Sequence, residues 1–201
     1  MGVDFDSLLL KAKIEIMTRS AFISTIVLSV KHVITTDVPT AGTDNTVVMY
    51  NPDFIKTLSP SEMAGLMAHE CWHIAYQHIA RRGNRDPIQW NIAGDHVINL
   101  ALLKGGFSLP ECGVHDPKYT DWSTDEVYDD IYEKDLPPLP DNYILDITGD
   151  NSGEEESSVV DIIVRAHTQA LIASEGKTIG EIPNEILRVI DKLLNPKIPW
   201  P

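Results

Sequence analysis

The segment that begins at Ser59 carries the strongest local signal in the sequence, because both ends of a helix can be recognised in it. Ser59 can cap the helix, Pro60 suits its first position, and Glu62 can reach back to complete a capping box. The Arg-Arg-Gly sequence that follows Ala80 is typical of a helix C-terminus. We therefore predict one helix that runs from about Pro60 to Ala80.

This predicted helix contains the sequence His69-Glu70-Cys71-Trp72-His73. An α-helix turns about 100° per residue, so His69 and His73 project from one face about 6 Å apart. That spacing allows both imidazoles to bind one Zn²⁺ at roughly 2.0–2.1 Å. Glu70 can lean over the metal without binding it and serve as general base toward a metal-bound water. The neighbouring residues are apolar, and an unpaired buried Glu or His would be costly, so we predict a zinc site here.

A catalytic zinc site with an open position needs a third protein ligand from another element. The predicted helix from Trp90 to Lys104 offers Asp95, a carboxylate in an otherwise apolar stretch, and its neighbour His96 is the rival ligand. Asn99, one turn after Asp95, is placed to hold a ligand imidazole by its second N–H. His78 falls about 180° around the first helix from His69, so we do not expect it to bind the metal.

The remaining patterns predict an α+β fold that is mostly helical with a small sheet. We expect an amphipathic helix in the first 20 residues and a short capped helix after Ser123. The predicted strands are Ser24–Thr35 and Thr46–Tyr50, and the last predicted helices are about Val159–Ser174 and Pro183–Leu194.

The amino-acid composition and charge argue against several classes of protein. Thirty acidic and sixteen basic side chains give a net charge of −14, which repels phosphate, so we expect no nucleic-acid and no membrane partner. No apolar run approaches the roughly 18 residues of a membrane span, and the acidic N-terminus lacks the positive charge of a secretory signal. Two cysteines are too few for a disulfide framework and favour a reducing compartment. We expect a soluble, cytoplasmic protein.

Taken together, these motifs resemble a family of predicted zinc metallopeptidases whose fuller members join an N-terminal peptidase domain to a C-terminal von Willebrand A-type domain. The joint pattern of H-E-x-x-H with W-N-x-A-x-D-x-x-I-N, here Trp90–Asn99, is far more specific than the first motif alone. The resemblance covers most of the chain, from about residue 5 to 198. Its other elements are Tyr50–Phe54, His78 with Arg81 and Arg82, Arg85–Pro87, and Ser123–Tyr128.

The resemblance implies a zincin-like fold and a zinc ion held by His69, His73 and Asp95, with Glu70 as catalytic base. It implies a peptide or protein as substrate. The von Willebrand module is absent, so a protein partner could supply that function. At 201 residues the chain fits a single domain, which we divide into a catalytic core at 1–135, a Pro-rich and acidic loop at 136–158, and C-terminal helices at 159–201.

Two segments of this division carry further expectations. Leu136–Pro140 is predicted to be a stiff spacer, and Asp146–Ser158 a mobile loop, because its Gly, Ser and consecutive Glu residues cannot bury enough apolar surface. The abrupt end at Pro201 is compatible with a piece of a longer protein.

The expected reaction is metal-assisted hydrolysis of a peptide bond, in which Glu70 takes the proton of the water and passes it to the leaving amine. The strand Thr46–Tyr50 could pair with an extended substrate. The oxyanion needs a hydrogen-bond donor, and the sequence does not choose among Tyr119, Tyr128, His96 and His115.

The main alternative function is a zinc-stabilised binding module in which the metal is structural and Glu70 has no catalytic role. A metal-free helical interaction protein is the third possible function.

Overall fold

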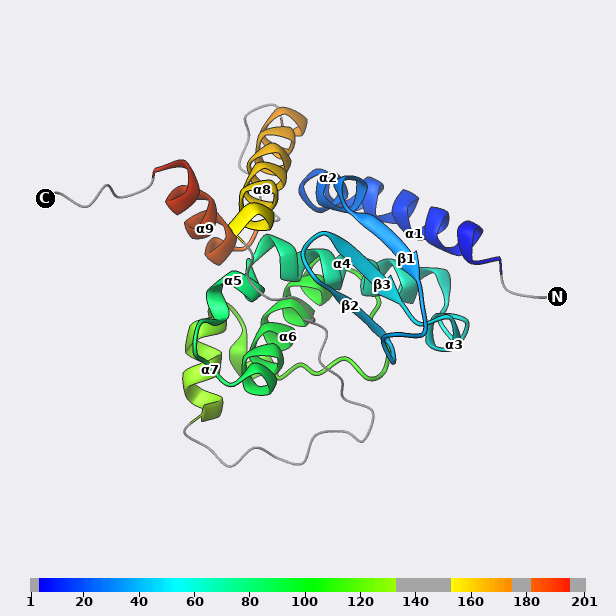
Figure 1. Cartoon of the computed structure of the whole chain (residues 1–201), viewed down its shortest axis with the longest axis horizontal. Helices are drawn as coiled ribbons and strands as arrows, with labels where there is room; N and C mark the ends of the chain where they lie inside the picture. Colours follow the sequence, from blue (N-terminus) through cyan, green and yellow to red (C-terminus); the bar gives the residue numbers. More distant parts are fainter. Residues whose placement is uncertain (1–3, 133–152, 175–181, 196–201) are drawn as a thin grey trace, which may run out of the picture.

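The computed structural model describes residues 4–132, 153–174 and 182–195. Within these residues the chain is mostly helical with one small three-stranded sheet (Figure 1), which confirms the predicted α+β class. The elements in chain order are α1 Phe5–Arg19, α2 Ala21–Ser29, β1 Lys31–Ile34, β2 Ala41–Thr43, β3 Val47–Tyr50, α3 Pro52–Ile55, α4 Pro60–Ala75, α5 His78–Arg82, α6 Pro87–Lys104, the 3-10 helix η1 Pro117–Tyr119, α7 Thr124–Tyr132, α8 Gly153–Ala173 and α9 Asn184–Leu194.

α4 is the central helix of the fold. α1, α2, α6 and the sheet all pack against it (Figure 1). The predicted capping box is present, since Glu62 N–H donates to Ser59 Oγ at 3.2 Å and Ser59 N–H donates to Glu62 Oε2 at 2.8 Å. Every residue of α4 from Met63 to Ala75 is buried. The side chains of the H-E-x-x-H motif therefore project into the protein interior.

α4 ends at Ala75, earlier than the predicted end at Ala80. Gln77 adopts a left-handed backbone conformation with φ of 53°, and the short helix α5 begins at the next residue, His78. Such a conformation costs a residue other than glycine roughly 1–2 kcal/mol. Neither glycine nor proline occurs at the break, so local sequence does not predict it. The basic pair before Gly83 ends α5 and not α4.

The first half of the segment predicted as a strand, Ser24–Thr35, is helical, and that prediction is wrong except for β1. α2 is capped by Ser20, whose Oγ accepts a hydrogen bond from Ile23 N–H at 3.3 Å. Its buried apolar residues recur at helical spacing: Phe22, Ile23, Ile26 and Val27. Burial of this face outweighs the preference of β-branched residues for strands, which depends strongly on context.

The sheet has the strand order β1-β3-β2, with β3 in the centre. β1 runs parallel to β3, with His32 opposite Val48, and β2 runs antiparallel to it, with Gly42 opposite Met49. β3 was predicted as Thr46–Tyr50 and begins one residue later. Because β3 has a partner strand on both sides, it offers no free edge, and its predicted pairing with a substrate is wrong.

α8 packs against α2, and α9 packs against α8. α8 begins at Gly153, so the last part of the segment Asp146–Ser158 is helical and not a loop as predicted. The first part of that segment and the predicted spacer Leu136–Pro140 lie outside the described residues.

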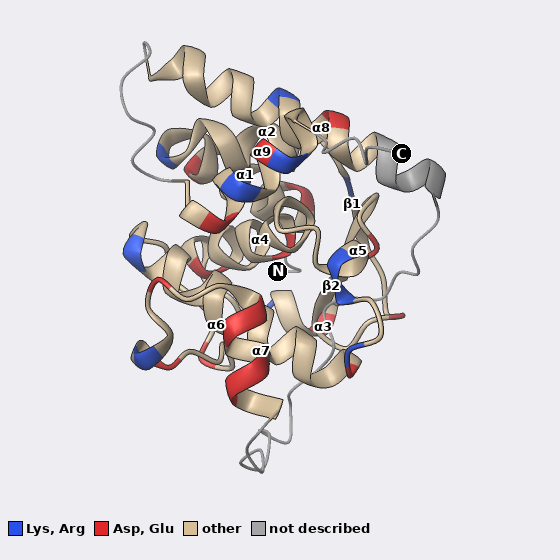
Figure 2. Ribbon diagram, turned by 90° about the vertical axis from the view of Figure 1, so that its left-hand side faces the viewer, with Lys and Arg blue, Asp and Glu red and all other residues tan. Residues whose placement is uncertain are grey.

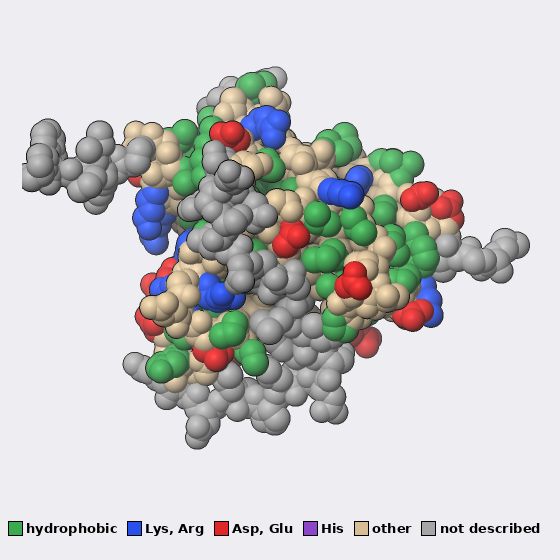
Figure 3. All heavy atoms as spheres, in the orientation of Figure 1, with side chains coloured by type: hydrophobic (Ala, Val, Ile, Leu, Met, Phe, Trp, Pro, Cys, Tyr) green, Lys and Arg blue, Asp and Glu red, His purple; other side chains and the backbone are tan. Residues whose placement is uncertain are grey.

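Acidic and exposed apolar side chains are concentrated on different helices. Acidic residues recur along α7 (Figure 2). α1 exposes apolar side chains at Leu10, Ile14 and Met17, and Figure 3 shows apolar surface over this part of the molecule. Among the described residues, no helix has the length and apolar character needed to span a membrane.

Candidate metal centre

Side chains from α4 and α6 meet in a buried cluster of three potential metal ligands. The Nε2 atoms of His69 and His73 lie 3.0 Å apart. Asp95 Oδ1 lies 3.4 Å from His69 Nε2 and 3.1 Å from His73 Nε2. The three side chains are buried, and each offers one ligand atom close to the other two. Two imidazoles and a carboxylate form a donor set found in catalytic zinc sites, so these residues could hold a metal ion.

Asp95 brings negative charge into the cluster. Burial by itself would raise the pKa of its carboxyl group, but hydrogen bonds from His69 and His73 hold that pKa below its usual value. Asn91, one turn earlier in α6, donates a hydrogen bond from Nδ2 to Asp95 Oδ2 at 3.2 Å. Asp95 is therefore a buried anion that faces two imidazoles, an arrangement that a divalent cation would stabilise.

Asn99 orients the imidazole of His69. Its Oδ1 atom lies 2.8 Å from His69 Nδ1, and its Nδ2 atom donates to the carbonyl oxygen of Val114 at 2.8 Å. The second contact settles which end of the amide faces the histidine, so His69 donates from Nδ1 and carries its lone pair on Nε2. That lone pair is on the ring nitrogen nearest Asp95. The sequence-based position of Asn99, one turn after Asp95, led us to expect this contact.

His78 contacts the imidazole of His73, which the sequence analysis did not anticipate. The two Nδ1 atoms lie 2.9 Å apart, and His78 Nε2 lies 3.0 Å from Thr124 Oγ1. Our placement of His78 on the far side assumed one continuous helix, and the left-handed Gln77 turns it back. Burial, above all, lowers the pKa of His78 well below its usual value, so the ring is neutral.

Gly94 makes room for the His78 ring against α6. A Cβ atom at position 94 would lie 2.7 Å from His78 Cε1 and 2.8 Å from His78 Nδ1, closer than a Cβ atom approaches other side-chain atoms in proteins. Trp90 also holds this residue, because its Nε1 donates to the His78 carbonyl oxygen at 2.8 Å. Two residues of α6, Gly94 and Trp90, therefore determine where the His78 side chain can lie.

Glu70, the candidate general base, is fully buried in α4. It lies near the central strand: burial, above all, raises the pKa of the Tyr50 hydroxyl well above its usual value, and the negative charge of Glu70 contributes to this shift. Burial also raises the pKa of the Cys71 thiol. Cys71 is therefore a thiol packed in the core.

Two of the four candidate oxyanion donors have hydroxyl groups engaged elsewhere. Tyr128 accepts a hydrogen bond from Asp86 N–H at 3.1 Å, at the start of α6 and about 13 Å along the helix from Asp95. Tyr119 donates to Asp130 Oδ2 at 2.8 Å. The structure therefore does not support Tyr128 as a residue of this site, and it directs the Tyr119 hydroxyl toward α7.

The two candidate histidines differ in position. His115 is exposed, and its Nδ1 lies 3.2 Å from the carbonyl oxygen of Gly113. His96 is partly buried with its ring centroid 5.0 Å from that of Tyr119, and burial lowers its pKa. Asp95, and not His96, joins the two motif histidines in the cluster.

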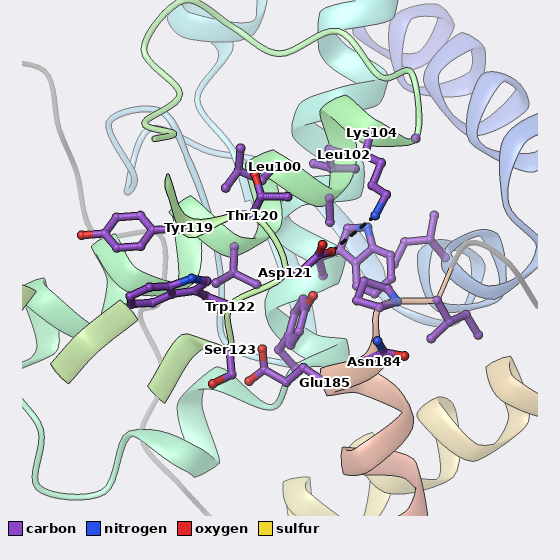
Figure 4. A pocket seen from close by; sticks show the side chains of 18 of the residues that line it. Leu100, Leu102, Lys104, Tyr119, Thr120, Asp121, Trp122, Ser123, Asn184 and Glu185 are labelled. Atoms are coloured by element: carbon purple, nitrogen blue, oxygen red, sulfur yellow. Dashed lines mark hydrogen bonds and ion pairs between the residues drawn. The ribbon is translucent and has the colours of Figure 1, made fainter. Parts of the chain in front are cut away.

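A cavity of about 420 Å³ lies on the neighbouring face of α4 (Figure 4). Trp72 of α4 and Tyr76, the residue that follows this helix, line it together with residues of α6 and the start of α9. The hydroxyl of Tyr76 is buried and has no hydrogen-bond partner among the described residues. The cavity thus borders the helix that carries His69 and His73 but is lined by different side chains.

Most of the chain is similar to a known family of proteins. Residues 5–138 match the sequence model of a family described as "Putative metallopeptidase domain". All three residues of the buried cluster lie within this range. No curated protein and no solved structure matches the chain. Because the match covers more than half of the 201 residues, the chain belongs to this family of metallopeptidase domains.

Proposed function

We propose that the protein is a zinc-dependent peptidase of the zincin type, in which His69, His73 and Asp95 hold the metal and Glu70 is the general base. One observation carries the proposal: two imidazole Nε2 atoms and a carboxylate oxygen from two helices lie within 3.4 Å of one another in the interior. The family of metallopeptidase domains supports the class of reaction.

The donor set fits zinc. Three protein ligands leave a fourth tetrahedral position open, as a catalytic zinc site requires. The hydrogen bond of His69 to Asn99 leaves the Nε2 lone pair of that histidine available within the cluster. When bound, zinc supplies a Lewis acid that lowers the pKa of a coordinated water and polarises the scissile carbonyl.

Side chains of the protein carry out the proton transfers. Glu70 follows His69 directly and takes the proton of the attacking water on its carboxylate, then passes it to the leaving amine. Asp95 offsets positive charge in the cluster. Among the four oxyanion candidates we retain His96, because it adjoins Asp95 in α6 and its Nδ1 has no hydrogen-bond partner among the described residues. The proposal also includes a protein partner, which supplies the function of the von Willebrand A-type domain.

A second candidate function is a zinc-stabilised binding module without catalysis. The observation that favours it is burial: His73 is 1% exposed and Glu70 is fully buried, so a substrate has little access to the cluster as it stands. A structural site more often has four protein ligands and several cysteines, and the cluster described here has three ligands and no cysteine.

Metal analysis and a peptide digest of the wild type and Glu70→Gln test the two functions together. The first function predicts about one zinc per chain in both proteins and cleavage of an unbiased peptide pool by the wild type, reduced about 10²–10⁴-fold or more in Glu70→Gln. Glu111→Gln, on the surface, is the matched control. Zinc in both proteins without cleavage by the wild type would favour the binding module, and absence of zinc would contradict both functions.

A further inference from the structure

We infer that Glu185, in the C-terminal helix α9, positions the metal ligand His73 through Thr124 and His78. The inference rests on the proposed function, because it takes His73 as a ligand of zinc. The four side chains come from α4, α5, α7 and α9. α9 lies beyond residues 5–138, so the inference adds to the centre a residue outside the part that matches the family.

A continuous series of short contacts links the four residues. His73 Nδ1 lies 2.9 Å from His78 Nδ1, and His78 Nε2 lies 3.0 Å from Thr124 Oγ1. Glu185 Oε2 lies 3.5 Å from the Thr124 hydroxyl and accepts the Thr124 N–H at 3.1 Å. Thr124 is thus held by Glu185 at two atoms.

Metal binding sets the direction of every hydrogen bond in this series. If His73 binds zinc through Nε2, its proton is on Nδ1 and is donated to His78 Nδ1. A neutral His78 that accepts at Nδ1 carries its proton on Nε2 and donates it to the Thr124 hydroxyl oxygen. The hydroxyl hydrogen of Thr124 then points to Glu185, a carboxylate that only accepts. Each donor has one acceptor, so the series selects a single tautomer for each ring.

The series is enclosed, so its members have little freedom to reorient. His73, His78 and Thr124 are at most 1% exposed. Arg81 fixes the far end through an ion pair with Glu185 at 2.5 Å. Figure 4 shows Glu185 pointing from the start of α9 toward the segment at Ser123, the residue that precedes α7. A partner that orients a ligand histidine typically contributes 10–100-fold to metal affinity.

A purely structural role for Glu185 would have a different consequence. Glu185 also joins α9 to the rest of the protein, because it binds Arg81 and the first N–H of α7. A structural role predicts that its loss lowers stability alone. The positioning role predicts weaker zinc binding in a protein that is still folded. Asp125 provides the matched control, because it binds the same Arg81 at 2.5 Å and Arg85 at 2.6 Å from α7.

The test uses the full chain and zinc alone as ligand. Zinc affinity is measured by competition with a chromophoric chelator, and folding by circular dichroism, for Thr124→Val, Thr124→Ser, Glu185→Gln and Asp125→Asn. We expect Thr124→Val to weaken zinc binding about 10-fold and Glu185→Gln to weaken it in the same direction. Thr124→Ser keeps the hydroxyl and should bind zinc like the wild type. Asp125→Asn should lower thermal stability without changing zinc affinity.

A second readout reports the tautomer of His78 directly. Long-range ¹⁵N NMR of the zinc-bound wild type should show the His78 proton on Nε2, and a proton on Nδ1 would contradict the series. Wild-type zinc affinity in a folded Glu185→Gln would overturn the inference and leave the proposed function intact. Absence of zinc binding in the wild type would overturn both. If Thr124→Val does not fold, the comparison of Glu185→Gln with Asp125→Asn decides.

Discussion

The Nδ1 atoms of His73 and His78 lie 2.9 Å apart across the break between α4 and α5. In one continuous helix these two side chains would point about 140° apart. The left-handed backbone of Gln77 removes that difference and returns the second histidine to the first. The surroundings of the candidate metal ligands therefore depend on where α4 ends, and not on the motif alone.

Asp95→Ala should weaken zinc binding by more than the 10–100-fold that is typical of residues that only orient a ligand, because it removes one of three ligand atoms. Asn99→Ala should stay within that range, since Asn99 contacts His69 Nδ1 and not the cluster of ligand atoms. His96→Ala should leave affinity nearly unchanged. A zinc titration with a chromophoric competitor compares all three. Wild-type affinity in Asp95→Ala together with a large loss in His96→Ala would identify His96 as the third ligand.

Removal of the metal should lower thermal stability. A ligand that binds only the folded protein at 100 times its Kd adds about 2.7 kcal/mol to the free energy of unfolding. We expect a chelator to lower the Tm of the zinc-loaded wild type, and to have little effect on Asp95→Ala, which lacks the carboxylate that faces His69 and His73. Differential scanning calorimetry with and without the chelator provides the comparison. An equal shift in both proteins would mean that the chelator does not act through this site.

Gly94→Ala should destabilise the protein, although alanine is favoured over glycine by about 1 kcal/mol within a helix. The new Cβ would lie 2.7–2.8 Å from the His78 ring, and overpacking of this kind costs about 1–3 kcal/mol. Gly105→Ala is the control, because its φ is −76° and the nearest atoms lie 3.4 Å from an added Cβ. Urea denaturation measures the free energy of unfolding of each variant. A Gly94→Ala protein as stable as the wild type would show that the His78 ring can move at no cost.

His32 should make the protein less stable in mild acid. Burial is the main cause that lowers its pKa from 6.5 to about 4 in the folded protein, where it contacts Tyr50 and Val27. The unfolded chain therefore takes up a proton near pH 6.5, while the folded chain does so only near pH 4. This contribution to stability is complete above pH 6.5 and is lost as the pH falls from 6.5 to 4, on the order of 3 kcal/mol in total.

His32→Gln should reduce this pH dependence, whatever its effect on stability at neutral pH. The measurement is the free energy of unfolding from urea curves between pH 4 and 7, and the exposed His115→Gln serves as control. The same slope in His32→Gln and the wild type would assign the acid sensitivity to other groups.

Much of the candidate site follows from local sequence. The spacing of His69 and His73 places them on one helix face, and the capping box at Ser59 marks where that helix begins. Asp95 could be chosen because a carboxylate within an apolar helix segment is hard to explain as a solvated charge, and the structure buries it beside the two histidines. These inferences hold because helix geometry is set by hydrogen bonds and side-chain contacts within one or two turns.

The other features were decided by contacts between distant segments. Residues 24–29 are helical because the apolar face of this segment is buried. β3 has no free edge because β1 and β2 pair with its two sides. Thr124 contacts His78 although it lies 46 positions later in the sequence, and Glu185 contacts Thr124 although it lies another 61 positions later. Neither residue lies in a motif with metal-ligand spacing. Sequence alone therefore determined which side chains share a helix face, whereas the end of α4 and the partners of His73 were decided by packing, because those contacts exist only once separate elements have come together.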